Sequence, residues 1–374
     1  MRRPLVIAWK ELIQLRRDHL TMAMAAALPI VQITLFGYAI NTDVRHIPTV
    51  VFDQDASAES RDLAATLRAT QFYDLVGEVR SYDDIDRALR SGRAHVALVV
   101  PPRFSSDLRR GRPTMVQLVV DGSDPQTVAS AIDTASGVVA DRAARLTTLR
   151  LGRLGLPAVA PAFTVEPSTW YNPELKTAIF VVPGLVGVIL TMTMIMLTAM
   201  GIARERERGT LEQLVVSPVG RLELMIGKII PYVGIGYTQM TLILLIGTVV
   251  FHTPFVGSLP LLYLLSSLFI AANLALGLFF STLARTQQQA MQMSFFFLLP
   301  NILLSGFMFP FDGMPRPAQF LAQALPLTHF LRIVRGIALK GAGLRDLWGE
   351  VIALGAILAV LIILAAARFR KTVD

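Results

Sequence analysis

The stretch TAIFVVPGLVGVILTMTMIMLTAMGIA, residues 177–203, holds 27 consecutive residues without Asp, Glu, Lys or Arg. A hydrocarbon core of about 30 Å is crossed by roughly 20 apolar residues in a helix. This stretch is therefore long enough to cross a membrane once. It decides the class of fold because comparable stretches recur along the chain.

Four further uncharged intervals cover residues 19–42, 229–284, 286–311 and 351–367. The interval 229–284 is interrupted at HTPFVGSLP, residues 252–260, and so predicts two spans. The sequence thus predicts an α-helical polytopic membrane protein with six transmembrane helices. The alternative is a large soluble protein with buried helices. It fits poorly, since 53% of the residues are hydrophobic and 17% are charged, against about 45–50% and about 25% in soluble domains.

The net charge of +8 is unevenly distributed. Residues 41–175 carry 15 basic and 17 acidic residues, whereas the rest of the chain carries 20 basic and 10 acidic residues. The excess of basic residues therefore belongs to the membrane part of the chain, where it indicates topology. For this reason no nucleic-acid partner is expected. A cytoplasmic N-terminus places 14 basic residues on inner segments and 6 on outer ones, as the positive-inside rule requires. Both termini are then cytoplasmic and residues 43–175 extracytoplasmic.

Within residues 43–175, the stretch 47–153 alternates strand and helix signals. Strand-like segments cover 47–52, 72–79, 94–100 and 115–120, and helical segments cover 57–68, 82–90, 104–110 and the region after Asp124-Pro125. This alternation predicts an inserted α/β domain with a mixed or parallel sheet. The proline-rich residues 157–173 are expected to lead back to the membrane in an extended form.

Asp53, Asp55, His95 and Asp121 lie near the strand ends, where sites often occur. Turn residues or surface charges are the favoured interpretation. No glycine-rich phosphate loop or nucleophile elbow follows any strand. We therefore expect no catalytic, cofactor-binding or metal site, and the absence of cysteine excludes thiolate and disulfide chemistry.

Residues 1–42 contain an amphipathic segment, 4–17, followed by the first span. Trp9 is expected at headgroup depth, with Lys10, Glu11 and Arg17 on the polar side of an interfacial helix. A cytosolic extension of the first span is the alternative for residues 4–17. The whole region is predicted to be an uncleaved anchor rather than a signal peptide, because the apolar stretch has spanning length and no clear small-x-small cleavage site.

The inner loop at 204–214 reads RERERGTLEQL. Its residues are Arg204, Glu205, Arg206, Glu207, Arg208, Gly209, Thr210, Leu211, Glu212, Gln213 and Leu214. Gly209 and Thr210 predict a turn into a short helix with Thr210 as its N-cap. Such a charged helix below a span is suited to docking a soluble partner. A solvated turn with internal ion pairs is the alternative.

Six further motifs lie in order along the chain. They are KE at 10–11 with RD at 17–18, WYNPEL at 170–175, VPGLVG at 182–187, GKIIPY at 227–232, SGFMFP at 305–310 and PLTHFL at 326–331. With the 204–214 segment and Ser217-Pro218, they resemble permease subunits of the ABC (ATP-binding cassette) type-2 exporter superfamily. The similar branch is the multidrug type with a large extracytoplasmic domain.

This resemblance implies a bacterial plasma (inner) membrane protein that forms a dimer with an identical or paralogous permease subunit. It also implies cytosolic ATPase subunits that carry ATP-Mg, with a periplasmic adaptor and an outer-membrane conduit as optional further partners. Residues 204–214 would be the coupling helix that contacts the ATPase, within a membrane domain of residues 176–374. An outer segment, 311–341, would carry an amphipathic interfacial stretch at 330–340.

The expected function is an ATP-driven exporter of hydrophobic or amphiphilic, drug- or lipid-like, substrates. The chain lacks a GxxxxGK[ST] sequence, so it needs a separate subunit to hydrolyse ATP. A proton- or sodium-coupled transporter is disfavoured, because no Asp, Glu, Lys or Arg lies deep in a predicted span. The alternative from another class is a membrane-anchored sensor or assembly scaffold whose outer domain binds a ligand or partner.

Overall fold

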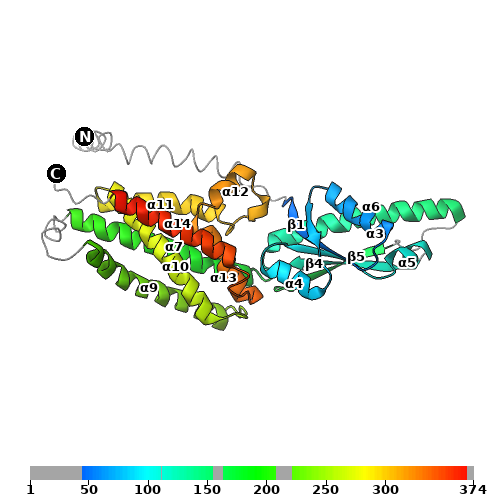
Figure 1. Ribbon diagram of the computed structural model, residues 1–374, viewed down its shortest axis with the longest axis horizontal. Coiled ribbons are helices and arrows are strands. Elements are labelled where there is room, and N and C mark those ends of the chain that lie inside the picture. Colours follow the sequence, from blue (N-terminus) through cyan, green and yellow to red (C-terminus); the bar gives the residue numbers. More distant parts are fainter. Residues whose placement is uncertain (1–43, 111, 155–162, 208–220, 369–374) are drawn as a thin grey trace, which may run out of the picture.

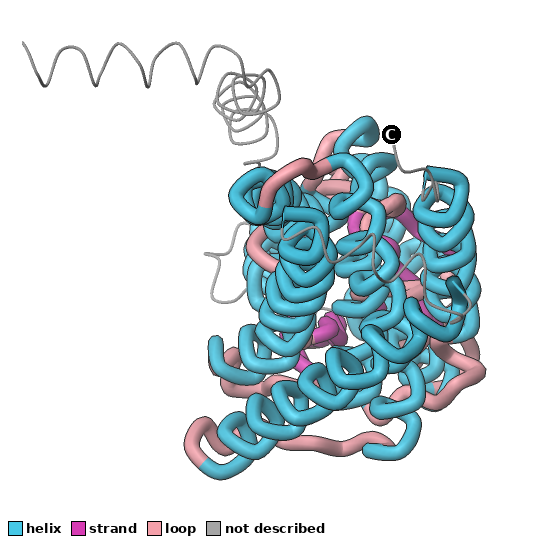
Figure 2. Tube along the Cα trace, turned by 90° about the vertical axis from the view of Figure 1, so that its left-hand side faces the viewer, coloured by secondary structure: helices cyan, strands magenta, loops and turns pink. Residues whose placement is uncertain are grey.

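The computed structural model describes residues 44–110, 112–154, 163–207 and 221–368. An α/β region lies at one end of a bundle of long helices (Figure 1). From the other end, the helices lie side by side with the strands behind them (Figure 2). The predicted interfacial helix and first span, within residues 1–42, lie outside the described residues.

The α/β region is built on a five-stranded mixed sheet. Its strands are β1 (Ile47–Asp53), β2 (Tyr73–Glu78), β3 (Val96–Val100), β4 (Thr114–Asp121) and β5 (Phe163–Trp170), in the order β2-β1-β3-β4-β5. β1 is parallel to β2 and β3, β4 is antiparallel to β3, and β5 is parallel to β4. The start of β1 and the end of β5 therefore lie at the same end of the sheet along the strand direction, and this end faces the helix bundle.

Helices cover both faces of this sheet. They are α3 (Ala58–Ala69), α4 (Tyr82–Arg90), α5 (Phe104–Arg110) and α6 (Pro125–Leu154). Alternate residues of β3 point to opposite faces, so Leu98 packs in the core with α3, α5 and α6, whereas Val99 packs in the core with α4. The side chains of Ser57 and Ser81 accept hydrogen bonds from the first turns of α3 and α4, which explains where these helices begin.

The extended form expected for residues 157–173 is confirmed for Phe163–Trp170, and the structure adds that this segment pairs with β4 as the strand β5. β5 is an edge strand. Proline is tolerated on an edge, where a missing backbone N–H breaks no ladder bond, so Pro167 does not prevent pairing. Phe163 is buried and lies perpendicular to the Phe104 ring, with 5.6 Å between ring centroids.

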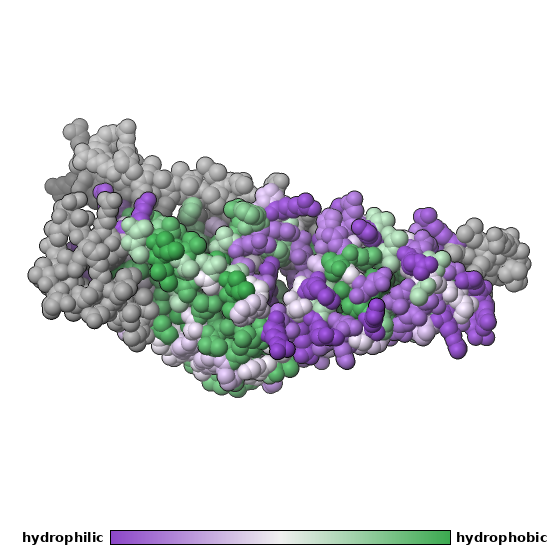
Figure 3. Space-filling view, in the orientation of Figure 1, coloured by the Kyte–Doolittle hydropathy of each residue, from purple (hydrophilic) through white to green (hydrophobic). Residues whose placement is uncertain are grey.

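Four described helices are long and apolar enough to cross a membrane. They are Thr177–Glu207, Pro231–Val249, Leu259–Leu283 and Trp348–Arg368, belonging to α7 (Thr177–Glu207), α9 (Arg221–Val249), α10 (Leu259–Leu283) and α14 (Trp348–Arg368). The predicted break at 252–260 separates α9 from α10. Hydrophobic side chains gather over the bundle and hydrophilic ones over the α/β region (Figure 3).

The interval 286–311 forms a shorter helix than predicted, α11 (Gln287–Leu304), and α11 is not among the four candidate spans. Its first turn holds three consecutive glutamines, Gln287 to Gln289, which lower its hydropathy. α11 ends before Gly306, whose φ of +84° allows a turn that L-residues rarely adopt. With residues 19–42 undescribed, six spans stay a prediction.

The segment between α11 and α14 contains η1 (Phe311–Gly313), α12 (Arg316–Ala322) and α13 (Pro326–Lys340). The expected amphipathic stretch at 330–340 is part of α13, but it is not a helix lying free on a surface. Most of α13 is buried, and Phe330 stacks on Phe269 of α10 with 4.0 Å between ring centroids. α13 therefore belongs to the core of the bundle, and its C-terminal end reaches the α/β region.

Candidate functional site

The predicted coupling residues begin within α7 itself. α7 continues beyond Ala203, where the predicted span ends, to Glu207. Arg204, Glu205, Arg206 and Glu207 therefore form its last turn, at the end of the bundle away from the α/β region (Figure 1). The other predicted coupling residues, Arg208, Gly209, Thr210, Leu211, Glu212 and Leu214, lie outside the described residues, as do Trp9, Lys10, Glu11 and Arg17.

The last turn of α7 is tied to the turn between α10 and α11. Arg204 Nε donates to Gln287 Oε1 at 3.0 Å, and Arg206 Nη1 donates to the Ala284 carbonyl at 2.7 Å. The backbone N–H of Gln287 donates to Glu207 Oε1 at 2.8 Å. A carboxylate at the start of α11 and a guanidinium at the end of α10 both suit the helix dipoles. The end of α7 is thus held to two neighbouring helices.

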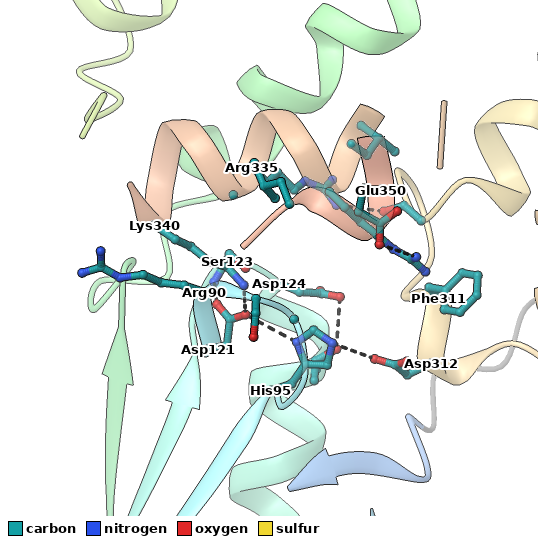
Figure 4. A pocket seen from close by; sticks show the side chains of 18 of the residues that line it. Arg90, His95, Asp121, Ser123, Asp124, Phe311, Asp312, Arg335, Lys340 and Glu350 are labelled. Atoms are coloured by element: carbon teal, nitrogen blue, oxygen red, sulfur yellow. Dashed lines mark hydrogen bonds and ion pairs between the residues drawn. The ribbon is translucent and has the colours of Figure 1, made fainter. Parts of the chain in front are cut away.

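A polar cavity of about 250 Å³ lies at the opposite end, between the α/β region and the helices (Figure 4). Its charged lining residues are Arg90, His95, Asp121 and Asp124 from the α/β region and Asp312, Arg332, Arg335, Lys340, Asp346 and Glu350 from the helices. Charges of both signs therefore meet where the two regions touch.

His95 and Asp121 are brought together by the sheet register. Val96 of β3 pairs with Val120 of the antiparallel β4, so the residue before β3 lies beside the last residue of β4. The backbone N–H of Asp121 donates to the His95 carbonyl at 2.9 Å. His95 Nδ1 lies 3.4 Å from Asp121 Oδ2, and His95 Nε2 lies 3.4 Å from Asp312 Oδ2. His95 thus bridges a carboxylate from each region.

Lys340 of α13 completes this cluster. Its ammonium group is bonded to Asp121 Oδ2 and donates to the Leu89 carbonyl at 3.0 Å. The Lys340 side chain is 8% exposed and that of Asp121 is 2% exposed. Lys340 is the last residue of its helix, followed by Gly341 in the left-handed conformation. This position lets one cation compensate both the helix dipole and a buried carboxylate.

The electrostatics of the cluster stabilise its charged form. Burial alone would raise the pKa of Asp121, but the Lys340 charge and the His95 hydrogen bond outweigh it, so the pKa is lowered. Burial would lower the pKa of His95, but the hydrogen bond to Asp121 and the charge of Asp312 raise it overall. The cluster is therefore a compensated network.

A second group of charges lies on the helix side of the cavity. Glu350 accepts a hydrogen bond from Arg332 Nη1 at 3.0 Å and lies 2.6 Å from His329 Nδ1. Arg332 also lies over the Phe311 ring, 4.4 Å from its centroid. Arg335 donates to the Gly306 carbonyl at 3.0 Å and lies over the Phe180 ring. These contacts join α13 to α14, α7, η1 and the end of α11.

Asp53 and Asp55 lie at the other end of the sheet. Asp53 Oδ1 accepts from the backbone N–H groups of Asp55 and Ala56, both at 3.0 Å, and Asp55 Oδ2 accepts from the N–H of Ser105 at 3.0 Å. These two carboxylates stabilise turns, which agrees with the interpretation of them as turn residues. For His95 and Asp121 that interpretation was incomplete, because both lie in the cluster with Lys340.

Comparison with known proteins decides the family. The family model described as "ABC-2 family transporter protein" matches residues 20–367. The chain belongs to the ABC-2 transporter family. It is 32% identical to "Probable multidrug ABC transporter permease YbhR" of Escherichia coli strain K12, over 97% of each chain. It is 29% identical to YbhS, which carries the same description, over 91% of this chain and 89% of that one.

A third relative, "Inner membrane transport permease YhhJ" of Escherichia coli strain K12, is 31% identical over 87% of this chain and 86% of that one. The family match includes the α/β region as well as the helices. This ABC-2 chain is therefore a multi-pass membrane protein, and the family match covers the residues that form its sheet. The resemblance drawn from the motifs is confirmed.

Proposed function

We propose that this ABC-2 chain is the permease subunit of an ATP-driven exporter. The observation that carries the proposal is the similarity to multidrug ABC transporter permeases along 97% of the chain. ATP-Mg would be bound by a separate cytosolic ATPase subunit, since this chain has no GxxxxGK[ST] sequence. A second permease subunit, identical or paralogous, would complete the transporter.

The geometry of α7 supports this mechanism. One helix of 31 residues runs from Thr177, beside the α/β region, to Glu207 at the far end of the bundle. At about 1.5 Å per residue, such a helix exceeds the thickness of a bilayer core. An ATPase pushing on residues 204–214 would tilt α7 together with the α10–α11 turn, because Arg206 and Glu207 are bonded to that turn.

The proposed cargo is hydrophobic or amphiphilic. Leu242, Leu245 and Ile246 of α9 are about half exposed, and the candidate spans are apolar. A pathway bordered by such helices, at the contact between two permease subunits, favours drug- or lipid-like molecules over ions. Residues 43–175 would lie outside the cytoplasm, with both termini inside, as the distribution of basic residues indicates.

Replacement of both Glu205 and Glu212 by lysine tests the coupling assignment. The double variant reverses two charges in the proposed contact with the ATPase, so we expect association with the ATPase subunit to fall at least about tenfold. The measurement is the amount of ATPase that co-purifies with the tagged chain from native membranes. Membrane insertion should stay normal.

The matched control replaces Glu78 and Asp133, both exposed in the α/β region, by lysine. It changes the net charge equally and should leave association unchanged. If the Glu205 and Glu212 variant retains the ATPase, residues 204–214 are not the coupling segment. If no ATPase associates even with the unmodified chain, the sensor or scaffold function replaces the exporter.

A further inference from the structure

The boundary between the α/β region and the helix bundle is polar. Two apolar cores lie within residues 44–171, and the others lie within residues 179–365. In the part of the chain that the structure describes, no apolar core cluster contains residues of both regions. Boundaries inside a chain that lack a large hydrophobic contact permit relative motion of the two parts.

The side-chain bonds that cross this boundary are concentrated on Lys340 and His95. Lys340 joins α13 to Asp121 and to the Leu89 carbonyl at the end of α4. His95 faces Asp312 of η1 at 3.4 Å. A weaker contact joins Gln126 Nε2 to the Met308 carbonyl at 3.5 Å. One lysine therefore supplies the strongest contacts between the regions.

The cavity beside Lys340 and Asp121 makes it feasible for this ion pair to separate. An ion pair surrounded by apolar side chains cannot separate cheaply, because each charge would lose its partner without gaining water. Here Lys340 and Asp121 line a polar cavity of about 250 Å³, which has room for several water molecules. Water in this space can hydrate both charges when the two regions part.

The position of α13 connects this contact to the rest of the molecule. α13 packs against α7, and Phe330 and Leu331 of α13 share one apolar cluster with Val186 and Leu190 of α7. The methyl end of Leu327 lies close to Gly187 of α7, because a Cβ atom there would be 2.6 Å from Leu327 Cδ1. A tilt of α7 must therefore displace α13 and with it Lys340.

We propose that Lys340 and Asp121 form a latch that holds the α/β region against the helices and opens in every transport cycle. This inference rests on the proposed exporter function. In the closed latch, the α/β region covers the end of the bundle, and in the open latch it is free to move away. The two residues are positioning residues that set the placement of the α/β region.

A reversible crosslink across the boundary tests the latch. The chain has no cysteine, so introduced cysteines are its only thiols. Ser91→Cys and Asp346→Cys line the cavity from opposite regions and leave Lys340 and Asp121 intact. A short bis-methanethiosulfonate reagent would link the two cysteines covalently across the boundary, and a reductant would break the link.

The measurement is phosphate release from ATP by the complex of the full chain with its ATPase subunit in lipid nanodiscs. We expect the crosslink to lower the rate at least tenfold and the reductant to restore it. The control is His46→Cys with Asp74→Cys, an exposed pair within the α/β region at 3.1 Å. Its crosslink should leave the rate within twofold of the uncrosslinked value.

A crosslinked complex that hydrolyses ATP at the full rate would overturn the latch while leaving the exporter function intact. A Ser91 and Asp346 pair that does not crosslink would also overturn it, because these walls would not face each other. If the unmodified chain binds no ATPase, the exporter function fails, and the latch fails with it. The three outcomes are thus distinguishable.

Discussion

The two ends of the helix bundle are both held by charged side chains, but they differ in burial. At the end of α7, Arg204, Arg206 and Glu207 are exposed and join helices to one another. At the end of α13, Lys340 and Asp121 are buried and join the helices to a separate region. Exposed contacts of charged side chains contribute about 0–1 kcal/mol, whereas removing one partner of a buried ion pair costs about 3–5 kcal/mol. The same residue types therefore join helices to one another at one end and, in the latch proposed above, hold the α/β region in place at the other.

Lys340→Met should have the largest effect on the contact between the regions. Asp121 would stay buried beside His95 without its main compensating charge, so we expect a loss of about 3–5 kcal/mol in the free energy of docking. Hydrogen exchange at the start of β3 and the end of β4 measures this loss. Adding Asp121→Asn should recover part of it, because no uncompensated carboxylate then remains. If the single variant exchanges like the parent, the buried pair does not hold the regions together.

Gly277→Ala tests whether the helices between the two ends pack as one rigid unit. A Cβ atom at Gly277 would lie 2.6 Å from the Ile195 carbonyl and 2.9 Å from Thr198 Cβ, both on α7. We expect a loss of about 1–3 kcal/mol, because the backbones must separate. Gly355→Ala in α14 is the control, since no atom beyond the backbone of its own helix turn lies within 4 Å of its added methyl group. Equal thermal unfolding of the two variants would contradict close packing of α7 on α10.

The pH dependence of docking also distinguishes the two ends of the bundle. His95 lies where the bundle meets the α/β region and is absent from the described contacts at the end of α7. Its pKa is raised above 6.5 in the docked state by Asp121 and Asp312, against the effects of burial and of Lys340. The stabilisation of docking by protonated His95 is therefore complete below about pH 6.5. It is lost as the pH rises through the pKa of His95 in the docked state. Each tenfold increase in the proton affinity of His95 on docking contributes about 1.4 kcal/mol.

Hydrogen exchange at the boundary between pH 6 and pH 8 measures this dependence. Besides Asp121, Asp312 and Lys340, Asp124 also faces His95, and a His95→Gln variant leaves all four side chains in place. That variant should show a flatter profile than the parent. Docking that strengthens as pH rises would contradict the assigned role of His95.

Arg204→Ala should have the smallest effect on stability. Its guanidinium bonds Gln287 in an exposed setting, so we expect a loss below about 1 kcal/mol in thermal unfolding. A loss as large as that of Lys340→Met would remove the contrast between the two ends. Gln287→Ala is the matched variant on the other side of this bond.

Local signals in the sequence predicted most of the α/β region. Ser57 and Ser81 fix helix starts within their own turns, and the predicted ranges for α4 and α5 agree with the structure. β5 was missed because Pro167 argues against a strand unless the strand is known to lie on an edge. Edge position depends on the whole sheet and is not encoded in eight residues.

The buried cluster could not be predicted because its partners are distant in the sequence. Asp121 and Lys340 are 219 residues apart, and no local pattern links them. His95 and Asp121 were recognised as strand-end residues, but their role depends on the β3–β4 register and on where α13 ends. The bonds of Arg204 and Glu207 to Gln287 were missed for the same reason, although the run of three glutamines at 287–289 was an available signal.

Co-purification from native membranes tests the central claim most directly. The tagged, unmodified chain is solubilised in mild detergent, and its partners are identified by mass spectrometry. The exporter function predicts a stoichiometric P-loop ATPase and a second permease subunit, identical or paralogous. If no ATPase appears in several detergents and with trapped nucleotide, the chain is not an ATP-driven permease, and the α/β region becomes the place to look for its function.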